Sequence, residues 1–304
     1  MSRLMAVVAA AILTLTACSD GGETGVSPSV HRGDVSMITV GPSDTLAPSL
    51  AWPGGVDFTL SQSKVMWQGE GEQLVDGQPL LLDMYIQSLA TAQVFENTYD
   101  GLPRSFLLAP ELLGENLYKV LLKARVGTRV LSVAPSSGEF DDEPAIAIVI
   151  DVLPDHAVGE RLEIADTLPQ VNTTATGEPA ITLNSTGEYP ADLTIATLVQ
   201  GDGPQVVPGS FIVAQIKIVY GADGEKDGES WKAGDVRQSS WLPEQAPFEG
   251  QLGLGKQLRA LDEGLIDQTG GSQVMLVAPE QWAYPGEGTL ILVIDILDVW
   301  NGET

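Results

Sequence analysis

The sequence has very few of the residues that form metal centres and disulfide frameworks. Of its 304 residues, 1 is cysteine and 2 are histidine. A single cysteine excludes a disulfide within the chain and a cysteine-rich zinc site, and two histidines argue against a multi-histidine metal centre. Aromatic residues make up only 6% of the chain and charged residues only 18%. We therefore expect no metal ion and no other cofactor.

Basic residues are also scarce. Lysine and arginine total 15 against 41 aspartate and glutamate residues, so the formal net charge is −26. Nucleic-acid binding requires a basic surface, and anionic lipid attracts basic segments, so neither is an expected partner of the folded part. Hydrophobic residues make up 43% of the chain, which is enough for buried cores. The length suggests two domains.

Residues 1–17 are typical of a bacterial signal peptide. Arg3 supplies a positive charge, and residues 4–15 form an apolar stretch too short to span a bilayer comfortably. The Leu-Thr-Ala sequence that follows, directly before Cys18, resembles the lipobox of bacterial lipoproteins. The resemblance implies cleavage before Cys18, a diacylglycerol on its thiol, and a protein exported and anchored to the outer face of the membrane. An ordinary signal peptide followed by a chance cysteine is the alternative.

Two polar segments divide the rest of the chain. Residues 18–50 are rich in glycine, serine, proline and threonine and predict a flexible tether. Residues 155–192 predict a linker, in which residues 180–183 could form a short strand. The segments left over, 51–154 and 193–304, are the predicted domains.

These two domains repeat each other in sequence. Three stretches match in the same order: 67–77 with 199–209, 126–135 with 270–279, and 148–153 with 292–297. Two copies at a spacing above one hundred residues indicate a duplicated domain rather than a solenoid of short repeats.

Each copy predicts the same succession of elements. The expected elements are a strand (79–85, 211–219), a short helix (111–124, 255–267) and two further strands (129–133 with 145–153, and 273–277 with 289–297). In the second helix Leu258, Leu261 and Leu265 are spaced to face a core. The last strand of each copy is continuously apolar, which is typical of a strand that is buried on both faces or wrapped around a helix. We predict the α+β fold class with antiparallel sheets.

Two short motifs suggest ligand sites, and each lacks a residue that the site requires. Residues Gly250–Lys256 resemble the start of a phosphate-binding loop, but Gln257 stands where a hydroxyl side chain would hold Mg²⁺. Acidic residues at 223–227 have the spacing of half a calcium loop, but Gly234 replaces the bidentate glutamate. A solvated acidic loop is the simpler interpretation of the second motif.

A longer series of motifs runs through the second copy. It comprises Gly201-Asp-Gly-Pro204, Gly209, Ser239-Ser-Trp241, Pro247-Phe248, Leu252-Gly253, Leu261-Asp-Glu-Gly-Leu265, Gly271-Ser-Gln273, Ala278-Pro-Glu280 and the strand 289–295. In order and spacing this series resembles the FKBP-type peptidyl-prolyl cis-trans isomerase domain, and more closely the tandem FKBP lipoproteins of actinobacteria. The resemblance covers residues 173–304 and extends more weakly to 55–154. It implies that each copy is an antiparallel sheet wrapped around one short helix, with an apolar aromatic pocket between them.

The resemblance also assigns the residues of that pocket. It implies catalytic roles for Phe248, Tyr284 and Trp282, and substrate-binding roles for Ile216, Trp241, Leu258, Leu261 and Leu292. Two departures from the family pattern predict weaker activity. Arg237 and Gln238 occupy the positions of a family Phe-Asp pair, which removes a carboxylate credited with polarising contacts, and Leu261 replaces the tryptophan of the pocket floor.

The first copy departs further and is expected to be degenerate and inactive. It keeps Phe95-Glu96 at the Phe-Asp positions, has Leu117 at the floor, and offers Phe106 as a wall of the pocket. The acidic stretch 136–144 replaces the loop that should carry the tyrosine.

The implied reaction requires neither proton transfer nor a cofactor. The barrier to rotation about an X-Pro bond is about 18–20 kcal/mol and arises from amide resonance. A dry pocket that binds the twisted amide better than the planar one lowers this barrier without a cofactor. We therefore predict an exported, lipid-anchored isomerase that acts on proline-containing polypeptides. The alternatives are a catalytically weak or inactive FKBP-like chaperone or binding module, and, less favoured because βαβ alternation is missing, a substrate-binding lipoprotein of a transporter.

Overall fold

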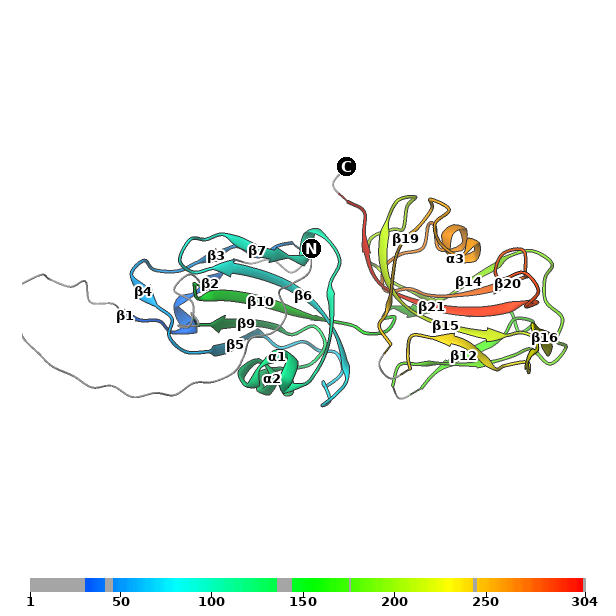
Figure 1. Cartoon of the computed structure of the whole chain (residues 1–304), viewed down its shortest axis with the longest axis horizontal. Helices are drawn as coiled ribbons and strands as arrows, with labels where there is room; N and C mark the ends of the chain where they lie inside the picture. The colour runs from blue at the N-terminus through cyan, green and yellow to red at the C-terminus, as the bar shows by residue number, and fades with distance from the viewer. Residues whose placement is uncertain (1–30, 42–45, 136–143, 175, 243–244, 303–304) are drawn as a thin grey trace, which may run out of the picture.

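The computed structural model describes residues 31–41, 46–135, 144–174, 176–242 and 245–302. These residues form two units that lie side by side in Figure 1, joined by a single crossing of the chain. The predicted signal peptide and Cys18 lie outside the described residues. Within the described part, none of the helices has the length and apolar character needed to cross a membrane.

The first unit is built on a six-stranded antiparallel sheet. Its strands are β5 (Gln62–Trp67), β6 (Pro79–Ser88), β7 (Val94–Asn97), β8 (Arg104–Leu107), β9 (Arg129–Ala134) and β10 (Ile146–Leu153). They lie in the order β5-β9-β10-β6-β7. The strand β8 pairs with the beginning of β6, and β7 pairs with its end, so the two share one edge of the sheet.

The second unit is built on a seven-stranded antiparallel sheet. Its strands are β11 (Glu160–Arg161), β14 (Thr194–Gln200), β15 (Phe211–Tyr220), β18 (Val236–Ser239), β19 (Phe248–Gln251), β20 (Gln273–Ala278) and β21 (Leu290–Trp300). Their order is β11-β14-β20-β21-β15-β18, and β19 pairs with the beginning of β15. A hairpin of β16 (Gly224–Lys226) and β17 (Glu229–Trp231) extends beyond β15. The predicted α+β class with antiparallel sheets is confirmed.

The two sheets have the same register, as the sequence repeat requires. Leu82 of β6 lies opposite Val152 of β10, and Ala214 of β15 lies opposite Ile296 of β21. These pairs occupy equivalent positions in the two copies, so residues of one unit can be compared with residues of the other strand by strand.

The helices are shorter than the sequence predicts. The helix expected at 111–124 is broken into α1 (Pro110–Leu113) and α2 (Glu115–Leu121). Between them Gly114 has a φ of +72°, a left-handed conformation that glycine adopts at little steric cost and that ends the first segment. In the second unit α3 (Arg259–Gly264) lies within the expected range 255–267.

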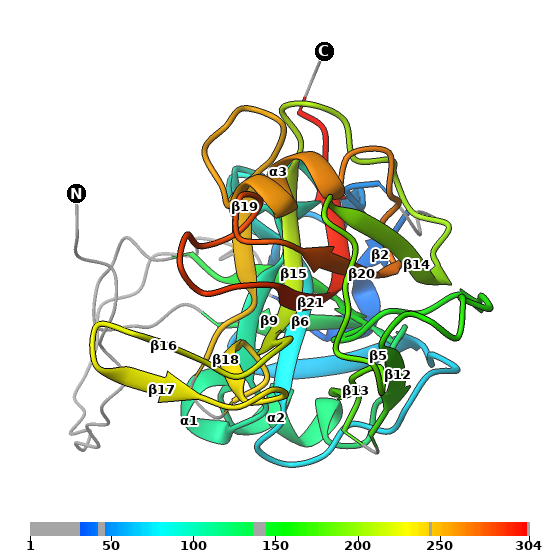
Figure 2. The ribbon, with the colours of Figure 1, turned by 90° about the vertical axis from the view of Figure 1, so that its right-hand side faces the viewer.

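Both faces of the second sheet are covered. On one face Ile216, Ile218, Leu292 and other apolar residues pack against α3. On the opposite face Val219, Ile291, Val293 and Met275 pack against residues of the predicted linker. Figures 1 and 2 show α3 and β12 (Gln170–Thr173) on opposite sides of the sheet. The continuous apolar run of β21 is therefore buried on both faces.

The linker predicted at 155–192 is the cover of that second face. The strands β12 and β13 (Pro179–Thr182) form an antiparallel hairpin, and β13 overlaps the strand expected at 180–183. Val171 is 3% exposed and packs with Ile181 and Leu183 against the sheet. Lys217 Nζ donates to Glu178 Oε1 at 2.7 Å, which ties the hairpin to β15. A docked hairpin, rather than a free linker, precedes the second sheet.

The first sheet has an equivalent cover, which corrects the prediction of a flexible tether over 18–50. The described part of that segment contains β1 (His31–Arg32), η1 (Val35–Met37), β2 (Thr39–Val40) and β3 (Leu50–Ala51), followed by β4 (Val56–Asp57). Val35 and Ile38 are 8% and 3% exposed and pack with Phe58 against β9 and β10. These scattered apolar residues have no helical or strand periodicity, so composition alone predicted a tether.

A buried ion pair marks the main polar difference between the two cores. In the first unit the Arg129 side chain is fully buried, donates to Asp151 Oδ1 from Nε at 2.6 Å, and lies 4.4 Å from the Trp67 ring centroid. In the second unit the equivalent residues are Gln273 and Asp295, and Gln273 Nε2 donates to Asp295 Oδ1 at 2.8 Å. A neutral amide therefore replaces the guanidinium.

We expect Arg129→Met to lower the free energy of unfolding by about 3–5 kcal/mol, because it leaves the Asp151 carboxylate without its cationic partner and, among the described residues, with only the Tyr99 hydroxyl, 2.7 Å from Oδ2, to donate to it. Arg129→Gln copies the arrangement of the second unit and should cost less. Urea denaturation of the chain without its signal peptide measures both variants. Equal losses in the two variants would show that a glutamine amide at position 129 cannot replace the guanidinium.

Candidate functional site

The structure brings seven of the eight predicted pocket residues into one apolar cluster. Ile216 of β15, Leu261 of α3 and Leu292 of β21 are buried in it, at 3%, 5% and 0% exposure. Partly buried residues that pack against this floor are Phe248, Leu258, Trp282 and Tyr284. The arrangement is an apolar floor with aromatic side chains at its rim, placed between α3 and the sheet.

The rim residues come from three segments, and Trp282 and Tyr284 share one of them. Phe248 begins β19 and lies opposite Ala214 of β15. Leu258 is the residue directly before α3, and its backbone carbonyl accepts from the Asp262 N–H at 2.9 Å. Tyr284 lies in the loop between β20 and β21, where Glu280 Oε2 accepts from the Gly286 N–H at 2.9 Å and closes the loop. The rim is therefore assembled from three segments that are separate in sequence.

Trp241 lies outside this cluster. It follows β18 in the connection to β19 and is partly buried. Its indole Nε1 is buried and has no hydrogen-bond partner in the described structure. Its assignment to substrate binding stays a prediction.

A stacked arginine is the feature of the rim that the sequence analysis missed. The guanidinium carbon of Arg237 lies 3.5 Å from the ring centroid of Tyr284. Arg237 is also paired with Glu287, from Nε at 2.5 Å and from Nη2 at 3.2 Å. The sequence showed Arg237 only as the loss of a family phenylalanine, since nothing in the order of residues connects it to Tyr284 or Glu287.

The same contacts determine the ionisation of Glu287. Hydrogen bonds from Arg237, and then its positive charge, hold the pKa of Glu287 below its usual value. Lys226 Nζ lies 3.7 Å from Glu287 Oε1 and donates to the backbone oxygen of Pro285 at 2.9 Å. One carboxylate thus joins β18, the β16–β17 hairpin and the loop that carries Tyr284.

Trp282 connects the pocket loop to the linker. Its Nε1 donates to Asp192 Oδ1 at 2.7 Å, and the guanidinium carbon of Arg259 lies 3.7 Å from its ring centroid. The neighbouring Gln281 Nε2 donates to the backbone oxygen of Ala191 at 2.8 Å. These contacts favour a positioning role for Trp282, and its catalytic role stays a prediction.

The equivalent position of the first unit carries an ion pair. Arg104 lies opposite Leu82, as Phe248 lies opposite Ala214 in the second unit, and Arg104 Nε is 2.7 Å from Glu96 Oε1. Phe95, the counterpart of Arg237, is 50% exposed. Phe106, two residues further along β8, lies opposite Leu80 and packs against the core cluster of the first unit. The acidic loop at 136–143 lies outside the described residues.

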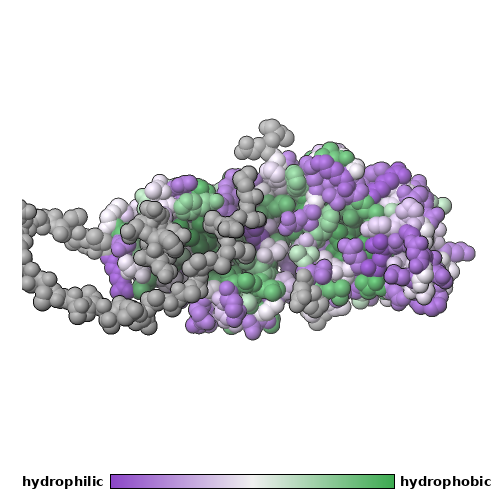
Figure 3. Space-filling view, viewed as in Figure 1, coloured by the Kyte–Doolittle hydropathy of each residue, from purple (hydrophilic) through white to green (hydrophobic). Residues whose placement is uncertain are grey.

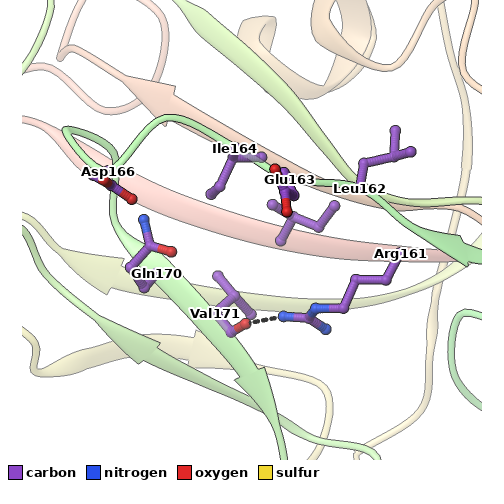
Figure 4. Close-up of a pocket in the computed structure, with 8 residues that line it drawn as sticks. Arg161, Leu162, Glu163, Ile164, Asp166, Gln170 and Val171 are labelled. Carbon is purple, nitrogen blue, oxygen red and sulfur yellow. Dashed lines mark hydrogen bonds between the residues drawn. The ribbon is translucent and has the colours of Figure 1, made fainter.

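A separate hollow lies on the linker side of the second sheet. It has a volume of about 390 Å³ and is lined by Arg161, Leu162, Glu163, Ile164, Asp166, Gln170, Val171 and Leu198. Figure 4 shows Arg161 donating to the backbone oxygen of Val171 across it. It lies on the face of the sheet opposite α3, so it is separate from the cluster that contains the predicted site residues.

Among the described residues, no three His, Cys, Asp or Glu side chains are placed to share a metal ion.

Fold and site together define a duplicated α+β unit in which a cluster of apolar and aromatic side chains lies between a short helix and an antiparallel sheet. No protein-family model matches the sequence. An FK506-binding protein of Streptomyces anulatus is 32% identical over 124 residues, which are 37% of this chain and 90% of that protein. The chain therefore belongs to the FK506-binding protein family.

Two solved structures were also found to be similar. The three FKBP domains of wheat FKBP73 match with 13% identity and a TM-score of 0.29, over 78% of this chain and 93% of that one. The structure of AtFKBP13 matches with 18% identity and a TM-score of 0.29, over 42% of this chain and 98% of that one.

We expect Glu287→Gln to lower the free energy of unfolding at pH 7 by about 1–2 kcal/mol, because it removes a charge-assisted pair with Arg237. The folded-state pKa of Glu287 lies below the unfolded value of about 4.3. Its contribution is therefore fully present above that pH and is lost as pH falls through the folded pKa. Melting temperatures of both proteins should differ at pH 7 and converge near pH 2–3.

Glu263→Gln is the matched control for this experiment. Glu263 pairs with Arg259 at 2.8 Å, but both side chains are more than half exposed. Such a pair contributes about 0.5 kcal/mol or less. An equal loss in the two variants would contradict the role given to Glu287.

Proposed function

We propose that this protein is a peptidyl-prolyl cis-trans isomerase whose active site is the aromatic pocket of the second unit. The observation that carries the proposal is the gathering of Phe248, Tyr284 and Leu258 around the buried floor of Ile216, Leu261 and Leu292, in a member of the FK506-binding protein family. Proline-containing polypeptides are the substrate class.

The pocket favours rotation of the prolyl bond by excluding water. A planar X-Pro amide is stabilised by resonance, and the twisted amide loses that resonance. An apolar rim and floor remove competing water, so contacts to the twisted form are stronger than they would be in solution. Only contacts that are better in the twisted form accelerate the reaction. Side chains at the rim, rather than the fully buried floor, are placed to make them.

We further propose that the chain is exported and anchored through a lipid on Cys18. The lipobox-like sequence before Cys18 supports this. Two or three acyl chains, at about 0.8 kcal/mol per buried CH₂, anchor a protein stably. The formal charge of −26 keeps the folded part away from anionic lipid. Clients would then be polypeptides that fold outside the membrane.

A binding module without catalysis is the second candidate. Gln238 stands where the family carries an aspartate, and Leu261 forms the floor in place of a tryptophan. The stack of Arg237 on Tyr284 also favours a binding module, because the guanidinium occupies one face of the ring of a predicted catalytic residue. The assay below separates the two candidates.

Exchange between cis and trans X-Pro tetrapeptides, followed by NMR with the chain from residue 19 onward, tests catalysis directly. Phe248→Ala removes about 1.5–3 kcal/mol of apolar contact, so kcat/KM should fall roughly 10- to 100-fold. Tyr284→Phe should lower activity less, since it removes a single hydroxyl. Circular dichroism establishes that each variant is folded.

Phe95→Ala serves as the control in the first unit, where the phenylalanine is 50% exposed. It should leave the rate unchanged, since the first unit is expected to be inactive. No acceleration by the folded wild-type chain would favour the binding module. Unchanged activity in Phe248→Ala would place catalysis elsewhere in the chain.

Lipidation has its own test in cells of the source organism or a related host. The wild-type protein should fractionate with membranes and incorporate a labelled fatty acid. Cys18→Ser should lose the label and appear in the medium, because the variant has no thiol to modify. Membrane retention of the variant would refute the anchor.

A further inference from the structure

Arg237 reaches the rim of the pocket from β18 and is held from two sides. The Tyr284 ring lies against the face of its guanidinium at 3.5 Å, and Glu287 accepts from Nε and Nη2 at 2.5 and 3.2 Å. The side chain is 20% exposed, so solute molecules can reach part of it.

The pairing with Glu287 determines which N–H groups of the Arg237 guanidinium remain available to a ligand. A carboxylate that accepts from Nε and Nη2 occupies one edge of the planar guanidinium. The two N–H groups of Nη1 are at the other end of the plane, away from that carboxylate. They are strong cationic donors at a rim whose other members are Phe248, Leu258 and Tyr284.

The orientation of this donor is established before any substrate binds. Glu287 lies close to Lys226 as well as Arg237, and Lys226 donates to the backbone oxygen of Pro285 in the same loop. The Glu287 side chain is only 11% exposed. Donors fixed in this way stabilise a developing charge without reorganisation during the reaction.

We propose that Arg237 is a catalytic residue, which donates an Nη1 N–H to the prolyl nitrogen as the amide twists. In the planar amide the nitrogen lone pair is delocalised and accepts poorly, and in the twisted amide it is localised and accepts well. The hydrogen bond is thus stronger in the transition state than in the ground state, which is the condition for catalysis. No bond to a heavy atom forms or breaks and the proton stays on Arg237. The inference rests on the proposed isomerase function.

The test measures kcat and KM separately for Arg237→Gln and Arg237→Lys, with the chain from residue 19 onward and X-Pro tetrapeptides. Losing one positioned donor should lower kcat by roughly 100-fold in Arg237→Gln, with KM nearly unchanged. The lysine variant keeps a cation but loses the planar fork, so an intermediate kcat is expected. Arg104→Gln breaks an exposed arginine–glutamate pair in the first unit and should match the wild type.

Chemical rescue distinguishes a donor from a structural support. Arg237→Ala leaves a space that free guanidinium can occupy, so millimolar guanidinium should restore part of kcat. Urea has nearly the same planar shape without the charge and should restore little. Rescue by urea to the same extent would show that Arg237 only fills space beside Tyr284.

The outcomes separate this inference from the function on which it rests. An inactive wild-type chain overturns both. An active wild type with a reduced rate in Phe248→Ala, but with unchanged kcat in Arg237→Gln, overturns the role of Arg237 alone. A rise in KM at constant kcat would do the same, because it indicates equal binding of the planar and twisted amides.

Discussion

The fold depends on burying both faces of each sheet. The strand β21 is apolar without interruption from Leu290 to Ile294, so one layer of helix cannot cover it, and each sheet recruits a second cover from the chain that precedes it. Residues 31–41 and 46–58 cover the first sheet, and the β12–β13 hairpin covers the second. On the surface, hydrophilic residues dominate the end of the second unit where β16 lies in Figure 1 (Figure 3).

The apolar cluster that contains Ile216, Leu261 and Leu292 depends on this packing in two ways. The ladder between β15 and β21 sets Ile216 and Leu292 on the face toward α3, and a slip of β21 by one residue would turn Leu292 toward the linker. The linker also contacts the loop between β20 and β21, because Trp282 Nε1 in that loop donates to Asp192 Oδ1. A segment whose main role is to cover one face therefore also positions the rim on the other face.

Duplication has left two units with one register and different chemistry. The first unit concentrates charge, with Arg129 paired to Asp151 in its core and Arg104 paired to Glu96 at the edge where the second unit has Phe248. The second unit has an amide contact from Gln273 to Asp295 in place of the core pair, and its Arg237, the counterpart of Phe95, stacks on Tyr284 and pairs with Glu287. The same backbone thus supports charged pairs at different positions in the two copies.

The sequence by itself determined the long strands and the burial of Leu261 and Leu292, because these follow from the apolar spacing of one helix and the apolar run of one strand. Three matches in the same order determined the duplication. The assignment of Leu261 and Leu292 to a pocket came from the resemblance to FKBP-type domains and stays a prediction. Only the tertiary structure decided what covers the sheets and which charged groups meet. Val35 and Ile38 are isolated apolar residues in a polar segment, and Arg237, Tyr284 and Glu287 come from different elements. Contacts of this kind depend on how elements pack, which no local pattern of residues records.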